Sequence, residues 1–306
     1  MPLISICIPA YKNPEFLMRL LNSIHMQRYK DYEVVITDDT PDNSLKPVVD
    51  QFKEVLPLNY IKNKVPLGTP ENWNFAISEA KGEWIKLMHN DDWFVSEESL
   101  YSFAQAAINN PNAELIFSGY FEVQDNNVIQ KRYVISNADE VLLRRSPINL
   151  FKENFIGSPS TTLIKNDHKE WYDQKIKWVV DFEYYIRRLK ESIFVAIKKP
   201  LINIGIHSNQ VTKSSFRKLE VEIPENLYLL EKLGEDSLRN IFVYDYYWRL
   251  FRNLKIRSLK QIKEYYDVNL PSKICKMLMF QFKIPLSVLY IGAFSKTFMF
   301  FSKCFS

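Results

Sequence analysis

The first 120 residues of the 306-residue chain alternate between short apolar runs and stretches in which apolar residues recur every three or four positions. The apolar runs predict strands, and the recurring positions predict amphipathic helices. The predicted strands are 3–9, 32–37, 58–62, 83–88 and 113–119, and the predicted helices are 14–24, 45–52, 70–77 and 97–108. Because strands and helices alternate, we expect an α/β fold with a mostly parallel sheet flanked by helices.

The first helix has a typical start signal in Asn13-Pro14-Glu15. Asn13 is predicted to be the N-cap, since its side chain can accept a hydrogen bond from the first turn. Pro14 suits the first helical position, and Glu15 complements the positive end of the helix dipole.

Three polar clusters each follow directly on a predicted strand. They are Pro9-Ala10-Tyr11, Asp38-Asp39 and His89-Asn90-Asp91-Asp92. In open parallel sheets ligands bind beyond the carboxyl ends of the strands, so we expect the three clusters to meet at one edge of the sheet. Their convergence indicates a binding site more strongly than any one cluster does.

The pattern changes after residue 120. Residues 121–135 predict a hairpin that turns at 125–127, residues 192–197 and 200–207 predict late strands, and a helix is expected from about 180 to 190. From about residue 215 the chain becomes helical and aromatic. We therefore predict two domains, an α/β domain at 1–214 and a helical, basic and aromatic extension at 215–306.

The adjacent carboxylates of Asp91 and Asp92 suggest a site for a divalent cation. Mn²⁺ and Mg²⁺ prefer oxygen ligands and are commonly held by one or two carboxylates together with substrate phosphates. The alternative is an ordinary polar turn, in which Asp is common. Asp38 and Asp39 leave a similar choice between a turn and an acceptor for a nucleobase N–H group.

Asp181 follows two apolar residues where a helix is predicted to begin. A carboxylate at this point could act as a general base. The structural alternatives are an acid favoured by the helix dipole and a local ion pair with Arg188.

Four blocks of the sequence, taken in order, resemble family 2 glycosyltransferases with the GT-A fold. They are residues 5–44, residues 68–93 (GTPENWNFAISEAKGEWIKLMHNDDW), residues 156–165 (IGSPSTTLIK) and residues 178–189 (WVVDFEYYIRRL). The resemblance covers about residues 3–212. It implies a GT-A sheet, a nucleotide-sugar donor and a requirement for Mn²⁺ or Mg²⁺.

The resemblance also implies roles for individual residues. In the donor site, Pro9, Ala10 and Tyr11 are expected to line the nucleoside, and Asp38 with Asp39 to contact the uracil or ribose. Asp91 is expected to contact the ribose or sugar. Asn72 is expected either to contact the pyrophosphate or to brace the Asp92 turn. Asn90-Asp91-Asp92 matches the family's DxD position, with Asn in place of the first Asp. Asp92 is then the metal ligand and Asp181 the catalytic base. His207 is either a further metal ligand or phosphate contact, or an ordinary loop histidine.

These roles predict a metal-dependent inverting glycosyltransferase of the hexosyltransferase type. A cation neutralises the diphosphate leaving group, and one base activates the acceptor hydroxyl, which is the minimum for direct displacement. The expected acceptor is a glycan or a lipid-linked glycan of a surface polysaccharide such as O-antigen. The alternatives are a nucleotidyltransferase and a non-catalytic carbohydrate-binding protein. The loop after the first strand lacks the glycine that a nucleotidyltransferase would need to hold a triphosphate. A non-catalytic protein would be expected to have lost carboxylates, but Asp38, Asp91, Asp92 and Asp181 are all present.

Other polar and aromatic residues have weaker assignments. Ser158, Pro159 and Ser160 are expected to form part of the acceptor floor, and Trp178 is either a platform for a sugar or a core residue. Trp73 is expected to pack in the core, and His89 to shape the turn before Asp91. His25 and His168 are predicted surface residues.

The extension is basic as well as apolar. Residues 252–306 contain ten Lys or Arg but only two acidic residues, Glu264 and Asp267. Its apolar segments are too short to span a bilayer, so an interfacial helix attracted to anionic lipid is favoured over a core helix or a dimer contact. A nucleic-acid partner is not expected, because the segment is far more apolar than a phosphate-binding arm.

Three scattered cysteines, Cys7, Cys275 and Cys304, form no disulfide framework, and no signal peptide is apparent. We therefore expect a cytoplasmic protein with peripheral contact at the inner face of the cytoplasmic membrane.

Overall fold

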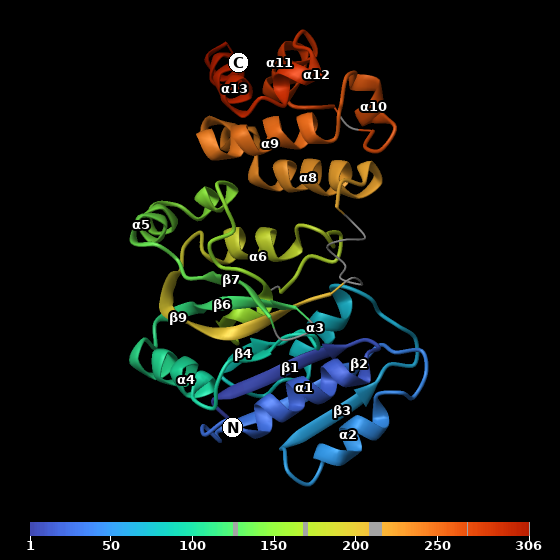
Figure 1. The fold of residues 1–306 in the computed structure, drawn as a ribbon, viewed down its shortest axis with the longest axis vertical. Coiled ribbons are helices and arrows are strands. Elements are labelled where there is room, and N and C mark those ends of the chain that lie inside the picture. Colours follow the sequence, from blue (N-terminus) through green and yellow to red (C-terminus); the bar gives the residue numbers. More distant parts are fainter. Residues whose placement is uncertain (125–127, 168–170, 208–215, 268, 306) are drawn as a thin grey trace. The chain divides into compact units, whose positions relative to one another are not determined.

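The computed structural model describes residues 1–124, 128–167, 171–207, 216–267 and 269–305. Within them the chain forms two compact units (Figure 1). Of the described residues, those within 1–145 and 155–207 form the first unit, and those within 146–154 and 216–305 form the second. The predicted hairpin turn at 125–127 and the predicted surface residue His168 lie outside the described residues.

A mixed sheet forms the centre of the first unit and confirms the predicted α/β class (Figure 1). Its strands are β1 (Ile4–Ala10), β2 (Tyr32–Asp38), β3 (Leu58–Lys62), β4 (Trp84–Leu87), β5 (Trp93–Phe94), β6 (Ala113–Gln124), β7 (Ile129–Tyr133), β8 (Thr162–Lys165) and β9 (Ile193–Ile206). Their order is β3-β2-β1-β4-β8-β6-β9-β5, with β7 paired to β6. Strands β1 to β4 run parallel, as do β6 and β9, whereas β5, β7 and β8 are antiparallel to their neighbours.

Helices cover both faces of β1. The helices of the first unit are α1 (Pro14–His25), α2 (Lys46–Phe52), α3 (Glu71–Ser78), α4 (Ser99–Asn109), α5 (Asn137–Arg145) and α6 (Val180–Arg188). Ile4, Ile6 and Ile8 share one apolar core with residues of α1, α2 and α4. The Cys7 thiol faces the other way and donates to the Ala76 carbonyl of α3 over 3.5 Å. Because successive strand residues point to opposite faces, this one strand anchors both layers.

Helices α1 to α4 confirm the predicted helices, but the predicted side-chain cap at Asn13 is wrong. Asn13 has left-handed dihedral angles (φ 52°, ψ 73°) and makes no side-chain capping bond. An N-cap side chain normally reaches the first turn from an extended backbone, and this geometry does not provide one. The Asn13 carbonyl instead accepts hydrogen bonds from the N–H groups of Phe16 (3.1 Å) and Leu17 (3.3 Å).

Strands β6 and β9 are continuous at points where the sequence predicted breaks. Gly119 ended a predicted strand, and residues 198–199 separated two late strands. In the structure Gly119 pairs with Pro200, and the pairing register shifts on both sides of this pair. The extra residues are therefore accommodated by an irregularity of the β-bulge type, and both strands continue past it. The predicted hairpin is present as the antiparallel pair β6–β7.

The second unit is helical, as predicted for the extension. It contains the 3₁₀ segments Pro147–Phe151 and Glu235–Arg239, and helices α8 (Leu219–Leu233), α9 (Ile241–Asn253), α10 (Leu259–Lys263), α11 (Ser272–Phe282), α12 (Leu286–Leu289) and α13 (Gly292–Cys304). Phe151 packs edge-to-face on Tyr246 of α9 with ring centroids 4.9 Å apart, and Asn240 Nδ2 donates to Asn149 Oδ1 over 2.9 Å. Residues 146–154 thus join the helical unit, although they precede the predicted boundary at 214/215. Across the described ranges, we find no helix with the length and apolarity needed to cross a bilayer.

Candidate active site

The ends of β1, β2 and β4 lie side by side because these are neighbouring parallel strands. After β1, the Lys12 N–H donates to Thr40 Oγ1, just beyond β2, over 2.8 Å. The Asn90 side chain, beyond β4, donates to the Lys12 carbonyl over 3.2 Å. The structure therefore brings the three polar clusters together at one edge of the sheet.

Asp91 and Asp92 lie in a tight turn between β4 and β5. The Asp92 N–H donates to the His89 carbonyl over 3.1 Å, which closes the turn. The His89 N–H donates to Ser160 Oγ over 3.0 Å, and Ser160 is fully buried. Ser160, expected as part of the acceptor floor, thus supports the aspartate turn.

Strand β9 holds the same turn through Gly205. The Gly205 N–H donates to Asp92 Oδ1 over 3.1 Å, and Asp92 is only 2% exposed. A Cβ atom at position 205 would lie 2.4 Å from the Asp91 carbonyl oxygen, so the close approach requires glycine. Burial, together with the neighbouring charge of Asp91, raises the pKa of Asp92 well above its ordinary value.

Asp91 is paired with His207 across this contact. Its Oδ2 lies 2.9 Å from His207 Nε2, and 22% of the Asp91 side chain is exposed. The His207 ring packs on Phe16 of α1 with centroids 4.9 Å apart. Burial acts to raise the pKa of Asp91, but the hydrogen bond with His207 and the charge of His89 outweigh it, and the pKa is lowered.

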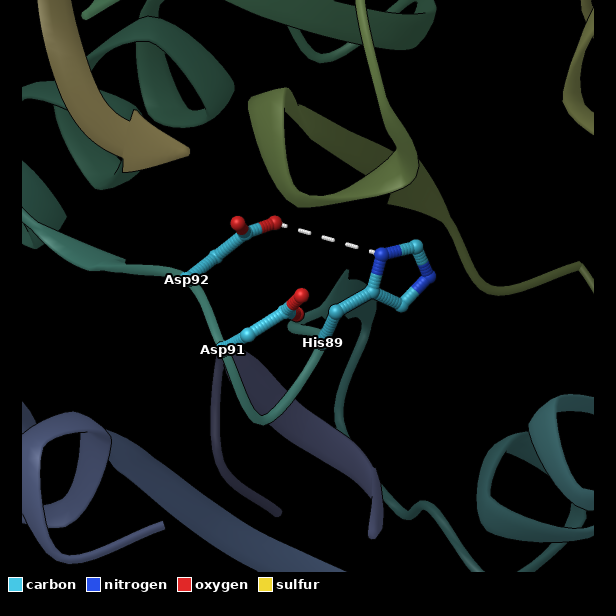
Figure 2. Close-up of side chains that lie close together, drawn as sticks. All are labelled: His89, Asp91 and Asp92. Carbon is cyan, nitrogen blue, oxygen red and sulfur yellow. Dashed lines mark ion pairs between the residues drawn. The ribbon is translucent and has the colours of Figure 1, made fainter. Parts of the chain in front are cut away.

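Three side chains of the turn offer ligand atoms for a metal ion. Figure 2 shows His89, Asp91 and Asp92 on the same turn, with a dashed line between His89 and Asp92. The ligand atoms of all three lie within 4.8 Å of one another, and His89 Nδ1 is 3.9 Å from Asp92 Oδ2. Carboxylate oxygens suit Mg²⁺ and Mn²⁺, and imidazole is a common ligand of transition metals. The turn therefore offers side-chain atoms of the kinds that bind a divalent cation.

Asp38 is the last residue of β2 and Asp39 follows it, and both are buried. The Asp38 carboxylate accepts hydrogen bonds from the Tyr60 hydroxyl (2.7 Å), the Lys62 ammonium group (3.0 Å) and the Thr40 N–H (2.7 Å). With no exposed surface of its own, Asp38 organises the end of the strand, and its contact with a nucleobase or ribose stays a prediction.

Asp39 fixes the loop that precedes α3. Its Oδ1 accepts from Asn63 Nδ2 (2.6 Å) and the Leu67 N–H (3.0 Å), and its Oδ2 accepts from the Gly68 N–H (2.7 Å). Asn72 joins this network, because its Oδ1 also accepts from Asn63 Nδ2 over 2.9 Å. Asn72 thus braces the loop of Asp39, a role that the sequence did not predict.

The loop after β1 presents the aromatic ring of Tyr11. Pro9 and Ala10 are buried, whereas Tyr11 is 48% exposed and has the Lys12 ammonium group 4.9 Å from its ring centroid. Of the three residues predicted to line the nucleoside, Tyr11 therefore offers the contact surface. Trp178, predicted to be either a sugar platform or a core residue, is partly buried.

Asp181 lies in the first turn of α6, where the sequence predicted it. Its Oδ1 accepts from the Phe182 N–H over 2.8 Å, and burial raises its pKa to about 6. The alternative ion pair with Arg188 is wrong, since the Arg188 guanidinium group lies 2.8 Å from the Asp167 carboxylate. Asp181 is thus a carboxylate with a raised pKa, and it forms no ion pair with a Lys or Arg side chain of the described residues.

A row of aromatic rings connects α6 to the aspartate turn. Trp73 packs on His89 with centroids 4.8 Å apart and meets Tyr172 edge-on at 5.1 Å. The Asn74 side chain holds the backbone of Tyr172. Asn74 Nδ2 donates to the Tyr172 carbonyl over 2.8 Å, and the Tyr172 N–H donates to Asn74 Oδ1 over 3.0 Å. Burial raises the pKa of Tyr172 well above its ordinary value, and the negative charge of Asp181 raises it further. Sequence reasoning missed Tyr172 because nothing in its local pattern marks a contact with residues about 100 positions earlier.

Comparison with known proteins identifies the family of this chain. Residues 5–176 match the model of Glycosyl transferase family 2. The putative colanic acid biosynthesis glycosyl transferase WcaA of Escherichia coli (strain K12) is 25% identical over 196 residues, which cover 62% of this chain and 67% of that protein.

Two solved structures share the fold. S. aureus TarS 1–349 in complex with UDP-GlcNAc has a TM-score of 0.67 at 17% identity, covering 98% of this chain and 90% of that one. The mannosyltransferase PcManGT from Pyrobaculum calidifontis, in complex with GDP-Man and Mn²⁺, has a TM-score of 0.56 at 12% identity, covering 99% and 86%. The expected GT-A fold is confirmed. Because the family model covers more than half of the chain, the protein belongs to glycosyl transferase family 2 and is a glycosyltransferase.

Proposed function

We propose that this glycosyltransferase moves one sugar from a UDP-linked donor, with Mn²⁺ or Mg²⁺ bound, to a hydroxyl group of a glycan. The observation that carries the proposal is the Asp91–His207 pair beside the buried Asp92, at the edge of the sheet where the three strand ends meet. The complexes of TarS with UDP-GlcNAc and of PcManGT with GDP-Man and Mn²⁺ support a nucleotide-sugar and a divalent cation on this fold. The family assignment argues against the nucleotidyltransferase and non-catalytic alternatives.

We propose Asp91 and His207 as the protein ligands of the cation, with Asp92 as their support. This moves the role of metal ligand from Asp92, to which the sequence assigned it, to Asp91. Asp92 is almost fully buried and already bound by the Gly205 N–H, whereas Asp91 keeps exposed surface and faces His207. The bound cation would neutralise the charge that develops on the leaving diphosphate.

The spacing of Asp91 and His207 is compatible with a shared cation. Neighbouring ligands of an octahedral ion with bonds of about 2.05 Å are about 2.9 Å apart. Asp91 Oδ2 and His207 Nε2 are 2.9 Å apart. An ordinary hydrogen bond has the same length. A measurement of metal binding therefore distinguishes a pair of metal ligands from a hydrogen-bonded pair.

We propose Asp181 as the general base. A carboxylate whose pKa is raised to about 6 is still ionised at neutral pH and is a better proton acceptor than an ordinary aspartate. A single base working against one leaving group favours inversion at the anomeric carbon. Tyr11 would supply the stacking surface for the nucleoside, and Asp38, Asp39 and Asn72 would hold the shape of that region.

For the acceptor we propose a glycan or lipid-linked glycan of a surface polysaccharide, made at the cytoplasmic face of the membrane. The similarity to a putative colanic acid biosynthesis glycosyl transferase supports this class of product. Peripheral contact with anionic membrane would bring the enzyme to a lipid-linked acceptor.

Loss of either proposed ligand should abolish metal-dependent nucleotide binding. With Mn²⁺ present, a saturating excess of UDP should raise the melting temperature of the wild type by about 4 °C, because ligand at 100 times its Kd adds about 2.7 kcal/mol to the free energy of unfolding. Asp91→Ala and His207→Gln should show little of this shift, and Asp50→Ala, an exposed aspartate on α2, should keep all of it. A full shift in both ligand variants, or an equal shift without metal, would contradict the proposed site.

Activity should fall on the acid side with the protonation of Asp181. Its pKa is raised, so the carboxylate gains a proton as the pH falls through about 6 and can no longer accept one from the acceptor. We expect kcat/KM to fall about tenfold per pH unit below that point. Asp181→Asn should lose about 10²- to 10⁴-fold in kcat while keeping its thermal shift with UDP and Mn²⁺. A pH-independent kcat/KM between pH 5 and 7 would rule out this base.

Gly205→Ala should weaken metal binding without replacing a ligand. The new methyl group would meet the Asp91 carbonyl at 2.4 Å and displace the turn, at a cost of roughly 1–3 kcal/mol in the free energy of unfolding. Gly292→Ala is the control, since a Cβ there meets no atom within 4 Å. Mn²⁺ titrations monitored with UDP present should show a higher Kd for Gly205→Ala alone, and an unchanged Kd would show that the turn tolerates the displacement.

A further inference from the structure

Helix α13 buries polar groups and exposes aromatic ones, the reverse of an ordinary surface helix. Its buried positions include Ser295, Met299 and Ser302. Ser295 Oγ accepts a hydrogen bond from Trp248 Nε1 over 3.0 Å, and Ser302 Oγ lies 2.7 Å from the Tyr244 hydroxyl. The helix is therefore attached to α9 by satisfied hydrogen bonds, and its apolar residues are left for another contact.

The outward face of α13 is rich in phenylalanine. Phe294 is 54% exposed, Phe300 is 47% exposed and Phe301 is 53% exposed. Tyr290 and Ile291, just before the helix, are 48% and 50% exposed. Phe294 and Phe301 are seven positions apart and lie on the same side of the helix. Large side chains on adjoining helical positions form an apolar surface of the kind that marks an interaction site.

The segment that carries this face has charges of one sign. From the start of α11 to the end of α13 the chain carries five lysines and no acidic residue; they are Lys273, Lys276, Lys283, Lys296 and Lys303. Lys276, Lys283 and Lys296 are exposed. This charge complements a negatively charged surface.

We propose that the face of Phe294, Phe300 and Phe301 inserts into an anionic lipid surface while neighbouring lysines contact the head groups. Phenylalanine on one face and lysine at its margin are the features of an interfacial helix. A protein interface is the less suitable occupant, because the cores of such interfaces are poor in lysine. Thirteen residues make a helix of about 20 Å, which lies in a membrane surface and does not cross it. The inference deepens the proposed function, since it rests on a membrane-borne acceptor and names the surface that would meet the membrane.

Co-sedimentation of the full-length protein with vesicles tests the proposal. Vesicles of phosphatidylglycerol and phosphatidylcholine in equal parts should carry down the wild type, and vesicles of phosphatidylcholine alone should carry down much less. The double variant Phe294→Ser/Phe301→Ser should bind the anionic vesicles at least about tenfold more weakly, because two aromatic side chains no longer enter the lipid. Lys296→Glu should also weaken binding, and added salt should reduce it further.

The matched control is Ile108→Ser, which removes a 54% exposed apolar side chain from α4 of the first unit and should leave vesicle binding unchanged. Thermal melting of each variant, with and without UDP and Mn²⁺, reports folding and donor binding separately from lipid binding. Equal vesicle binding by the wild type and the double variant would overturn the proposal. So would a wild type that ignores anionic vesicles but dimerises through this face, seen by sedimentation velocity as a dimer that the double variant loses.

Discussion

The close contact between the aspartate turn and Gly205 of β9 is the interaction on which the rest of the site depends. The Asp91 carbonyl lies where a side chain at position 205 would have to be, and the Gly205 N–H binds the carboxylate of Asp92. Because His207 is two residues further along, the same contact sets the distance between His207 and Asp91. One glycine therefore controls the geometry of residues that are more than 100 positions apart in the chain.

A second support comes from a buried lysine. Lys86 on β4 is fully buried, and its ammonium group donates to the carbonyl oxygens of Ser160 and Thr162. Burial lowers its pKa well below the ordinary value. Ser160 in turn accepts the N–H of His89. The turn is thus fixed from two sides, which is what a site needs if its groups are to be preorganised for a charged substrate.

The sequence was sufficient to predict β1 to β4, helices α1 to α4 and the edge at which the polar ends of the strands meet, but it did not predict β5, β8 or α5. Those features follow from local periodicity, as in β1 and α1, and from the general topology of parallel sheets. The sequence could not show which of the two adjacent aspartates is the ligand and which is its support, because this depends on which of them β9 covers. Gly205 carried no local signal, since its role is a long-range steric one. The cap predicted at Asn13 failed because the tight reversal after β1 imposes a left-handed backbone there.

The central claim is that Asp91 and His207 share a divalent cation. Electron spin-echo envelope modulation of Mn²⁺ bound together with UDP would detect a directly coordinated imidazole nitrogen. We predict such a nitrogen coupling in the wild type and its loss in His207→Gln. A wild-type spectrum without nitrogen coupling, or an unchanged coupling in His207→Gln, would show that the 2.9 Å pair is a hydrogen bond and not the metal site.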